Sequence, residues 1–154
     1  MQNWYASLEE GANSFQAYGV DAEYQAVMHE RAVDPVADVV VSWLGRMLYG
    51  APKGVKPIVV HRDYQASRSA VSKAMELAPK LEALMTEIDV EVGLGVPIMK
   101  DDHEMLRVVY RFNSTTHWGQ SVDKMIADDR FVSLVNEAHE TATPQKSRML
   151  AIVS

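Results

Sequence analysis

The stretch "VEVGLGVPIMKDDHEMLRVVYRF" (residues 90–112) decides the fold, because it predicts two antiparallel strands joined by a short turn. In residues 90–98, aliphatic side chains alternate with glycine, glutamate and proline, which is the period-two pattern of a strand with one apolar face. Pro97 favours an edge position in the sheet, since proline cannot donate a ladder hydrogen bond. The polar segment 100–104 predicts the turn and residues 105–112 predict the second strand, so the two strands form a hairpin.

The segment before this hairpin predicts a strand followed by a helix. "PIVVHRDY" (57–64) is rich in β-branched residues and is bounded by proline and polar turn residues, as strands are. In residues 67–88 the apolar side chains recur at spacings of three and four, which indicates a helix, and Ser67 is suited to cap its N-terminus. Pro79 lies inside this pattern, so we expect it to kink or divide the helix.

The segment after the hairpin predicts a second helical region and a last strand. The apolar pattern of residues 117–140 is helical, but its phase slips across residues 128–130, which predicts two short helices or one bent helix. "RMLAIVS" (148–154) then predicts a strand. Residues 57–154 therefore follow the order β-α-β-β-α-β. This order predicts an α+β, ferredoxin-like module with an antiparallel sheet and both helices on one face.

Length, composition and charge limit the classes of function. The chain has 154 residues, of which 47% are hydrophobic and 23% charged, so it is long enough for one globular domain or two small modules with a common core. A net charge of −6, without any run of Lys or Arg, argues against a nucleic-acid partner. No apolar stretch approaches the length of a membrane span, and the N-terminus does not resemble a secretory signal. With no cysteine, we expect a cytoplasmic protein without disulfides or thiolate chemistry.

The first third of the chain requires a separate interpretation. Residues 1–50 predict two helices, followed by a strand at residues 36–43, and residues 51–56 belong to a linker rich in glycine and proline. Two alternatives remain open for residues 1–50. They form either a partial ferredoxin-like module of the order β-α-β or a helical N-terminal arm that packs on the sheet of residues 57–154.

An internal similarity favours the partial module. Residues 5–30 align without a gap on residues 112–137 at a constant offset of 107, which places Asp21 on Asp128. If this is a repeat, the chain holds one complete module and the end of another and could be part of a longer tandem protein. A sheet truncated in this way exposes edges and apolar surface, and a second chain or module would have to cover them.

The segment "SVDKMIADDRFVSLV" (121–135) resembles the second helix of the dimeric α+β barrel superfamily. That superfamily includes the antibiotic-biosynthesis monooxygenase-like, EthD-like, NIPSNAP-like and stress-responsive barrel proteins. The similarity lies in a methionine-containing turn followed by Asp128 and then Phe131, and it extends over residues 57–154 and partly over residues 1–50. The resemblance implies that two sheets pack face to face, within or between chains, around a small barrel. Members of the superfamily use this interior for small aromatic compounds, polyketides or haem, and some have no catalytic role.

Strand alternation predicts where a site would lie, because side chains of one parity share a face of the sheet. The face opposite the helices is expected to carry Glu91, Gly93, Gly95, Arg107 and Arg111, and a central polar cluster forms there if the first strand presents His61 and Asp63 on the same face. We expect Arg107 and Arg111 to bind an acidic or enolate oxygen while His61 acts as acid or base, with the two glycines leaving space for a ligand. The alternative is that these side chains form ion pairs in a dimer interface, since buried polar groups need partners whatever the function.

The remaining candidates are weaker. His117 and Trp118 at a helix start could line the mouth of a pocket, although a capping role for the histidine and a core role for the tryptophan are more typical. His103 lies in an acidic turn whose side chains are expected to face solvent, so we predict no metal site. Haem binding would require His61 or His117 as the axial ligand, and we expect no cofactor.

The sequence therefore predicts a small-molecule-binding α+β barrel that forms a homodimer. One form of this hypothesis is a cofactor-independent monooxygenase or isomerase that acts on an aromatic or polyketide-like compound. The alternative is a non-catalytic oligomerising protein whose barrel is filled with side chains.

Overall fold

The computed structural model describes residues 3, 5–34, 44–99 and 103–151. They fall into two compact units, Met1–Ser42 and Trp43–Ser154, which we describe separately. None of the helices in these ranges combines the length and the apolar composition needed to cross a membrane.

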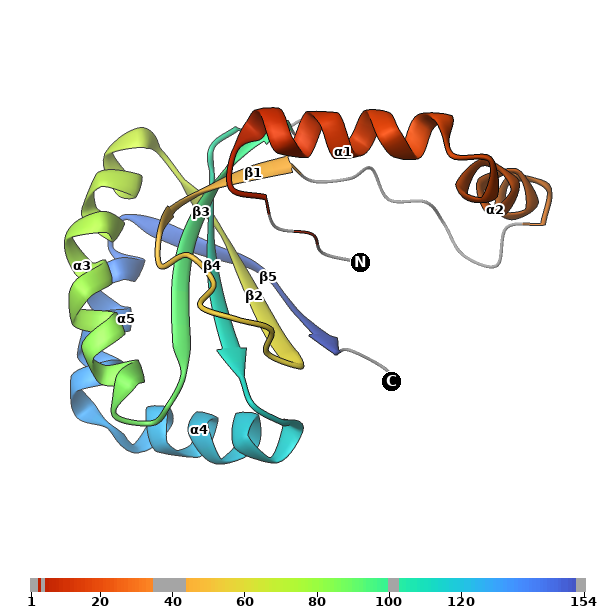
Figure 1. Cartoon of the computed structure of the whole chain (residues 1–154). Coiled ribbons are helices and arrows are strands. Elements are labelled where there is room, and N and C mark those ends of the chain that lie inside the picture. Colours follow the sequence, from red (N-terminus) through yellow and green to blue (C-terminus); the bar gives the residue numbers. More distant parts are fainter. Residues whose placement is uncertain (1–2, 4, 35–43, 100–102, 152–154) are drawn as a thin grey trace. The chain divides into compact units, whose positions relative to one another are not determined.

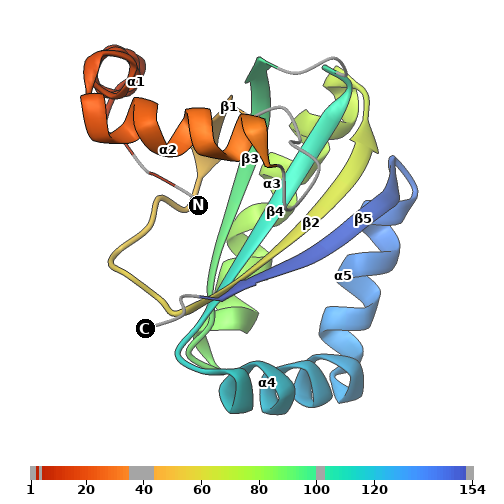
Figure 2. The ribbon, with the colours of Figure 1, turned by 90° about the vertical axis from the view of Figure 1, so that its right-hand side faces the viewer.

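The second unit is an α+β structure built on a five-stranded antiparallel sheet (Figure 1). Its elements are β1 (Leu44–Tyr49), β2 (Ile58–Ala66), α3 (Arg68–Thr86), β3 (Glu91–Met99), β4 (Met105–Phe112), α4 (Thr115–Ala127), α5 (Asp129–His139) and β5 (Ala142–Ala151). The strand order is β1-β3-β4-β2-β5. Helices α3 and α5 cover one face of the sheet, and α4 crosses one of its ends (Figures 1 and 2).

The hairpin and the helix starts of this unit agree with the sequence predictions. Strands β3 and β4 pair antiparallel, with Val92 opposite Tyr110. The Ser67 side chain accepts a hydrogen bond from the backbone N–H of Ala70, as an N-cap does. The expected break in the C-terminal helical region is also confirmed, because Asp128 ends α4 and its side chain caps α5.

The structure narrows one prediction about these elements and contradicts two others. Of the two alternatives for Pro79, division does not occur, because α3 is one continuous helix with buried side chains on both sides of the proline. Strand β3 is not an edge strand, because β1 pairs with it; Pro97 is tolerated because it lies beyond Gly95, the last residue paired with β4. Strand β5 begins at Ala142 rather than at residue 148 and contains a proline, which an outer strand of the sheet accommodates.

Strand β1 was not predicted from the sequence. The strand expected at residues 36–43 lies outside the described residues, and Leu44–Tyr49 supplies the strand beside β3. This strand has only six residues, and its pairing with β3 is irregular. So short a segment shows too little alternation of apolar and polar residues to predict a strand.

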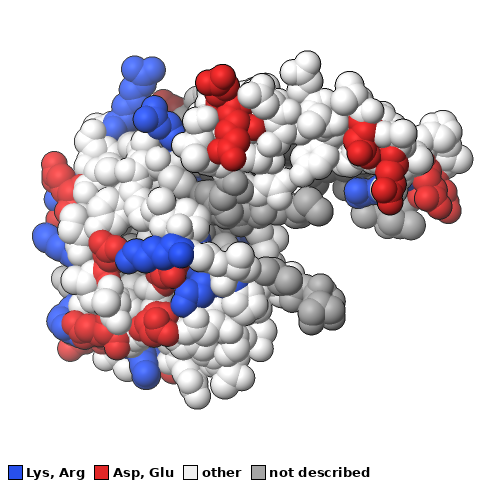
Figure 3. Space-filling model, in the orientation of Figure 1, with Lys and Arg blue, Asp and Glu red and all other residues white. Residues whose placement is uncertain are grey.

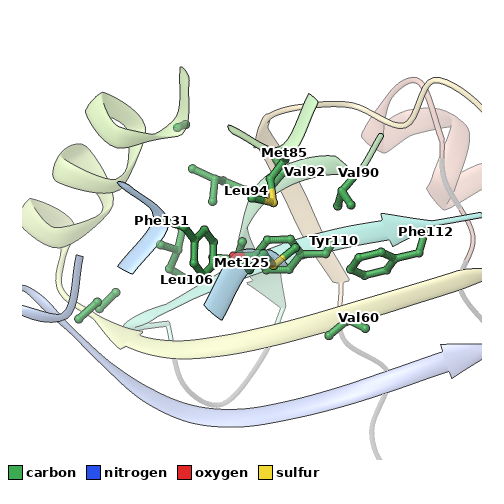
Figure 4. Packing of buried hydrophobic residues seen from close by; sticks show 14 of the residues in the cluster. Val60, Met85, Val90, Val92, Leu94, Leu106, Tyr110, Phe112, Met125 and Phe131 are labelled. Carbon is green, nitrogen blue, oxygen red and sulfur yellow. The ribbon is translucent and has the colours of Figure 1, made fainter. Parts of the chain in front are cut away.

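The hydrophobic core lies between the sheet and the helices. Met85, Met125 and Phe131 pack from the helical side toward Leu106 and Tyr110 of β4 (Figure 4). Leu106 and Tyr110 belong to the apolar row of β4 that alternation assigns to the helix-covered face. The other parity of each strand must therefore point to the opposite face of the sheet.

The first unit contains two consecutive helices, α1 (Leu8–Val20) and α2 (Ala22–Val33). The side chain of Ser7 caps α1, while Asp21 ends α1 and caps α2. No residue of either helix is buried.

Candidate functional site

Four ionisable residues from strands β2 and β4 meet on the sheet face opposite α3 and α5. His61 and Asp63 come from β2, and Arg107 and Arg111 come from β4; all four are at most 5% exposed. They share this face because each lies at alternate positions of its strand, and the register places Asp63 directly opposite Arg107. The structure therefore brings together four of the residues that the sequence singled out.

The carboxylate of Asp63 is the centre of this cluster. Arg107 donates to it with two bonds, Nε to Oδ1 at 2.6 Å and Nη2 to Oδ2 at 2.8 Å. Arg148 of β5 donates a third bond, Nη2 to Oδ2 at 2.9 Å. Paired bonds from one guanidinium to one carboxylate fix geometry as well as charge, so Asp63 holds both arginines against the sheet.

Arg148 was missed by the sequence prediction. It stands directly opposite His61 in the register between β2 and β5, and its side chain is 39% exposed. Alternation within "RMLAIVS" could have assigned it to a face, but only the pairing of β5 with β2 shows which face that is.

The electrostatics of the cluster keep His61 neutral. Burial, followed by the positive charges of Arg107 and Arg148, lowers the pKa of His61 from 6.5 to about 4, although the Asp63 carboxylate opposes this shift. Burial also tends to raise the pKa of Asp63, but the hydrogen bonds and charge of Arg107 and Arg148 outweigh it and leave the pKa lowered. At neutral pH the cluster therefore contains an ionised aspartate, charged arginines and an uncharged imidazole.

The Nε2 atom of His61 is buried and has no hydrogen-bond partner within the part of the chain that the structure describes. The Nε atom of Arg148, on the neighbouring strand, is in the same condition. Buried polar atoms normally have partners, and leaving one without a bond is costly. Two such atoms on directly opposite residues leave hydrogen-bonding capacity on this face that the described residues do not use.

Arg111 extends the positive charge toward β3. It stands opposite Glu91 in the register, and its Nη1 donates to the carbonyl of Gly50 at 3.4 Å. Burial lowers the pKa of Arg111 while the charge of Glu91 raises it, and guanidinium groups remain charged at neutral pH. Glu91 also lies 3.9 Å from the ammonium of Lys56.

The space beside Gly93 and Gly95, which the sequence suggested for a ligand, is occupied by residues of this chain. A Cβ atom on Gly93 would lie 2.5 Å from the Met47 side chain and 2.6 Å from the Gly50 carbonyl oxygen. On Gly95 it would lie 3.1 Å from the Met47 sulfur. Because the two glycines have no side chains, β1 can approach β3 closely. Met47 of β1 fills the space that the sequence predicted for a ligand.

His117 and Trp118 lie away from the cluster, in the first turn of α4. The Nδ1 atom of His117 accepts from the backbone N–H of Asn113 at 3.1 Å, which leaves Nε2 to donate to the carbonyl of Ile88 at 2.8 Å. Ser114, and not His117, is the N-cap, and Trp118 is 36% exposed rather than part of the core. With both ring nitrogens bonded, His117 does not offer an axial ligand for haem.

Within residues 3, 5–34, 44–99 and 103–151, no three His, Asp or Glu side chains are placed to hold a metal ion. Acidic and basic side chains are interleaved over the second unit on the side seen in Figure 3 and do not gather into a basic patch there.

Two hollows of the second unit lie on its helical side. One is an apolar cavity of about 70 Å³ between the sheet and helices α3 and α5, with Tyr64 and His139 among its lining residues. The other is a groove of about 440 Å³ between α3 and α5, bordered by charged side chains that include Glu87 and Arg130. Arg130 donates hydrogen bonds to both Glu87 and Asp128. The charged side chains at this groove therefore pair with one another in a surface network.

No protein-family model matches the chain, and no curated protein matches it. The solved structures that match the chain include the following two. A conserved protein from Methanosarcina mazei Go1 is 16% identical, covers 60% of this chain and 86% of its own, and gives a TM-score of 0.41. Rv0793 from Mycobacterium tuberculosis is 15% identical, covers 63% of this chain and 95% of its own, and gives a TM-score of 0.40. Likenesses of this size assign neither a family nor an activity to the chain.

Proposed function

We propose that β2 to β5 and their helices form a ferredoxin-like module, and that its charged face closes against a second sheet as in dimeric α+β barrels. The order β3-β4-β2-β5 supports this, because it puts the first and third strands of the module in the middle of the sheet. Buried charged side chains on the face without helices also support it, since such groups require cover and partners. Strand β1 is then an addition to the edge of this module.

The domain proposal follows the internal similarity. Residues 1–50 are the end of a first module, residues 51–56 are the linker, and residues 57–154 are the second module. Helices α1 and α4 have equal lengths and lie 107 positions apart, and an aspartate separates each from the next helix. Equivalent helix starts and a shared break support a duplication better than residue identity alone does.

The function that this geometry supports best is the binding of a small organic anion beside His61. The observation that carries the proposal is the buried Nε2 atom of His61, which has no partner in the described part of the chain and lies among cationic side chains. A carboxylate, enolate or phenolate oxygen would bind to the unsatisfied donor of Arg148 while a neighbouring hydroxyl or acidic C–H contacts the imidazole.

The same groups can perform a proton transfer. An uncharged imidazole accepts a proton, and the guanidinium groups of Arg107 and Arg111 stabilise the anion that this step forms. Formation of a bound enolate or phenolate is the first step of an isomerisation and also of an oxygenation that uses no cofactor. This form of the hypothesis makes His61 the base and an aromatic or polyketide-like acid the substrate.

Nuclear magnetic resonance of the full chain tests the binding site. Salicylate should shift the ring resonances of His61 and raise its pKa above about 4, because the bound anion offsets the arginine charges. Salicylamide has the same ring and hydroxyl but no carboxylate, and it should leave them unchanged. The variant Arg148→Met should weaken binding, whereas Arg130→Met, which removes an exposed arginine of α5, should have no effect.

The proposal is wrong if salicylate and related aromatic acids leave the His61 resonances unmoved up to about 10 mM, a concentration at which even weak specific sites are occupied. Equal shifts with salicylamide would show that hydrophobic contact, and not the arginine charge, causes the binding.

A second candidate function is a non-catalytic interface between copies of the chain. Its support is that Asp63 already occupies Arg107 with two bonds and that Met47 fills the space beside the two glycines. In that case the chain should be a dimer whose His61 signals respond to protein concentration and not to aromatic acids. Sedimentation velocity combined with the titration separates the two candidates.

A further inference from the structure

The apolar cavity of about 70 Å³ on the helical side of the sheet has walls of small and aliphatic side chains. Ala70, Ala74 and Ala78 lie four residues apart on α3, so they share the face of this helix that borders the cavity. Buried leucines of the sheet, Leu94 and Leu106, belong to the wall on the other side. Because alanine has only a methyl side chain, α3 leaves a space here that a longer side chain would fill.

The side chain of Tyr110 lies in the same wall of the cavity. Tyr110 is 4% exposed, and none of the described residues forms a hydrogen bond with its hydroxyl group. Burial, followed by the nearby Tyr64, raises the pKa of Tyr110, so the hydroxyl stays protonated and can donate. Phenylalanine would occupy nearly the same volume without an unpaired hydroxyl, which is costly when buried. The hydroxyl is therefore a second feature, besides the alanines, that fits a ligand in this cavity.

The entrance of the cavity lies where α5 ends. His139 and Thr141 are the exposed residues of the lining, and Tyr64 is half-buried. The rings of Tyr64 and His139 are tilted against each other, with centroids 5.9 Å apart. Hydrogen-bonding groups thus surround the entrance while aliphatic groups line the interior, which is the usual arrangement of a small-molecule site.

The volume of the cavity limits the size of the ligand. An apolar cavity of about 150 Å³ accommodates benzene, and one water molecule takes about 30 Å³ in the liquid. A space of about 70 Å³ therefore suits a chain of about three or four carbon atoms and is too small for an aromatic ring. Water fills such a space poorly, because a buried water molecule needs about two to four polar partners and most of this lining is aliphatic.

The charge around the entrance favours an uncharged ligand. The C-terminal end of α5 carries the partial negative charge of the helix dipole, and Glu140 follows His139 there. Both would repel a carboxylate but not a hydroxyl group. Tyr110 can donate a hydrogen bond to a hydroxyl oxygen, and the same hydroxyl can donate to Tyr64.

We propose that this cavity binds a short-chain aliphatic alcohol of about three or four carbon atoms. Its hydroxyl group lies between Tyr64 and Tyr110, and its chain extends along the alanines of α3 toward Leu94. The His61 cluster is on the opposite face of the sheet, so this site is separate from the one proposed above and does not depend on it.

Nuclear Overhauser effects measured on the full chain test the site, with 1-butanol as the probe. At about 10 mM, enough to occupy a weak specific site, the methyl protons of 1-butanol should give effects to the methyl groups of Leu94 and Leu106. Butyrate has the same chain with a charged head, and benzyl alcohol has a hydroxyl group on a ring that is too large. Neither compound should give these effects at the same concentration.

Three variants locate the probe in the cavity. Tyr110→Phe retains the ring and should weaken binding of 1-butanol by about fivefold, the typical effect of one hydrogen bond. Ala74→Leu should abolish binding and raise the urea midpoint, because the larger side chain fills apolar space. The matched control is Ala83→Leu, which makes the same substitution at an exposed position of α3 outside the cavity and should leave binding unchanged.

Four results would overturn the proposal. The first is the absence of effects from 1-butanol to Leu94 and Leu106 at about 10 mM, which would make the cavity a packing defect. The second is equal binding by Tyr110→Phe and the unmodified chain, which would mean that the hydroxyl has no ligand. The third is retained binding in folded Ala74→Leu, and the fourth is equal binding of butyrate or benzyl alcohol. Salicylate binding is measured at His61, so failure here leaves that result unaffected.

Discussion

Replacing Asp63 by asparagine is the most direct test of the charged cluster. The carboxylate is 5% exposed and accepts three bonds, of 2.6, 2.8 and 2.9 Å, from two arginines. Asparagine has nearly the same shape but no charge, so the variant Asp63→Asn removes the carboxylate that binds the buried guanidinium of Arg107 through two hydrogen bonds.

The expected loss of stability is large. Removing one partner of a buried ion pair costs about 3–5 kcal/mol, and we expect the lower end, about 3 kcal/mol, because the cluster lies on a sheet face and not inside the apolar core. With an m-value of about 2 kcal/mol/M, the urea midpoint should fall by about 1.5 M. The pKa of His61 should also fall below about 4, since the Asp63 charge is the influence that raises it.

Urea unfolding followed by circular dichroism measures the first effect, and a resonance titration of His61 measures the second. The matched control is Glu137→Gln, which breaks the 2.7 Å ion pair between the partly exposed side chains of Glu137 on α5 and Lys73 on α3 and should shift the midpoint by much less than Asp63→Asn. If Asp63→Asn unfolds within about 0.3 M of the unmodified chain, the arginines are hydrated in solution and the buried cluster described above does not exist.

Three further predictions concern single residues. The pKa of His61 is lowered to about 4 in the folded chain, so the unfolded state binds more protons between about pH 4 and 6.5. The free energy of unfolding should therefore fall as the pH drops through this window, and it should fall less in His61→Gln. Urea midpoints measured at several pH values test this. Gly93→Ala should lower the free energy of unfolding by about 1–3 kcal/mol, because the new Cβ meets the Gly50 carbonyl. Gly95→Ala should lower it clearly less, because its Cβ meets mainly the flexible Met47 side chain. Equal urea midpoints for the two variants would contradict this. His117→Ala should lower stability by about 1–2 kcal/mol through two lost hydrogen bonds, while salicylate binding stays unchanged; loss of binding with unchanged stability would reverse the assignment of this histidine.

The polar side of the sheet could be predicted because alternation is a local property. His61 and Asp63 share one parity of β2, and Arg107 and Arg111 share one parity of β4, so each pair follows from the sequence once the strands are recognised. That the two pairs lie on the same face follows from the pairing of β2 with β4. Arg148 could not be assigned in the same way. Its position opposite His61 depends on the pairing of β5 with β2, which joins segments more than eighty residues apart and involves a register shift near Asp63.

The glycines of β3 show the same limit. Their small size suggested room for a ligand, but what fills such room depends on which strand lies beside β3. Strand β1 was not recognisable from its own residues, so the Met47 side chain that occupies the space could not be foreseen.

The sequence by itself determined the helix caps, the hairpin, the break at Asp128 and the separation of apolar from charged rows. These features depend on residues a few positions apart, whose hydrogen bonds and periodicities act within one element. Only the tertiary structure decided that β3 lies inside the sheet, that Arg148 joins Asp63 and that Met47 lies over the glycines. These features arise from pairing between distant strands, where the free energy comes from contacts that no single segment contains.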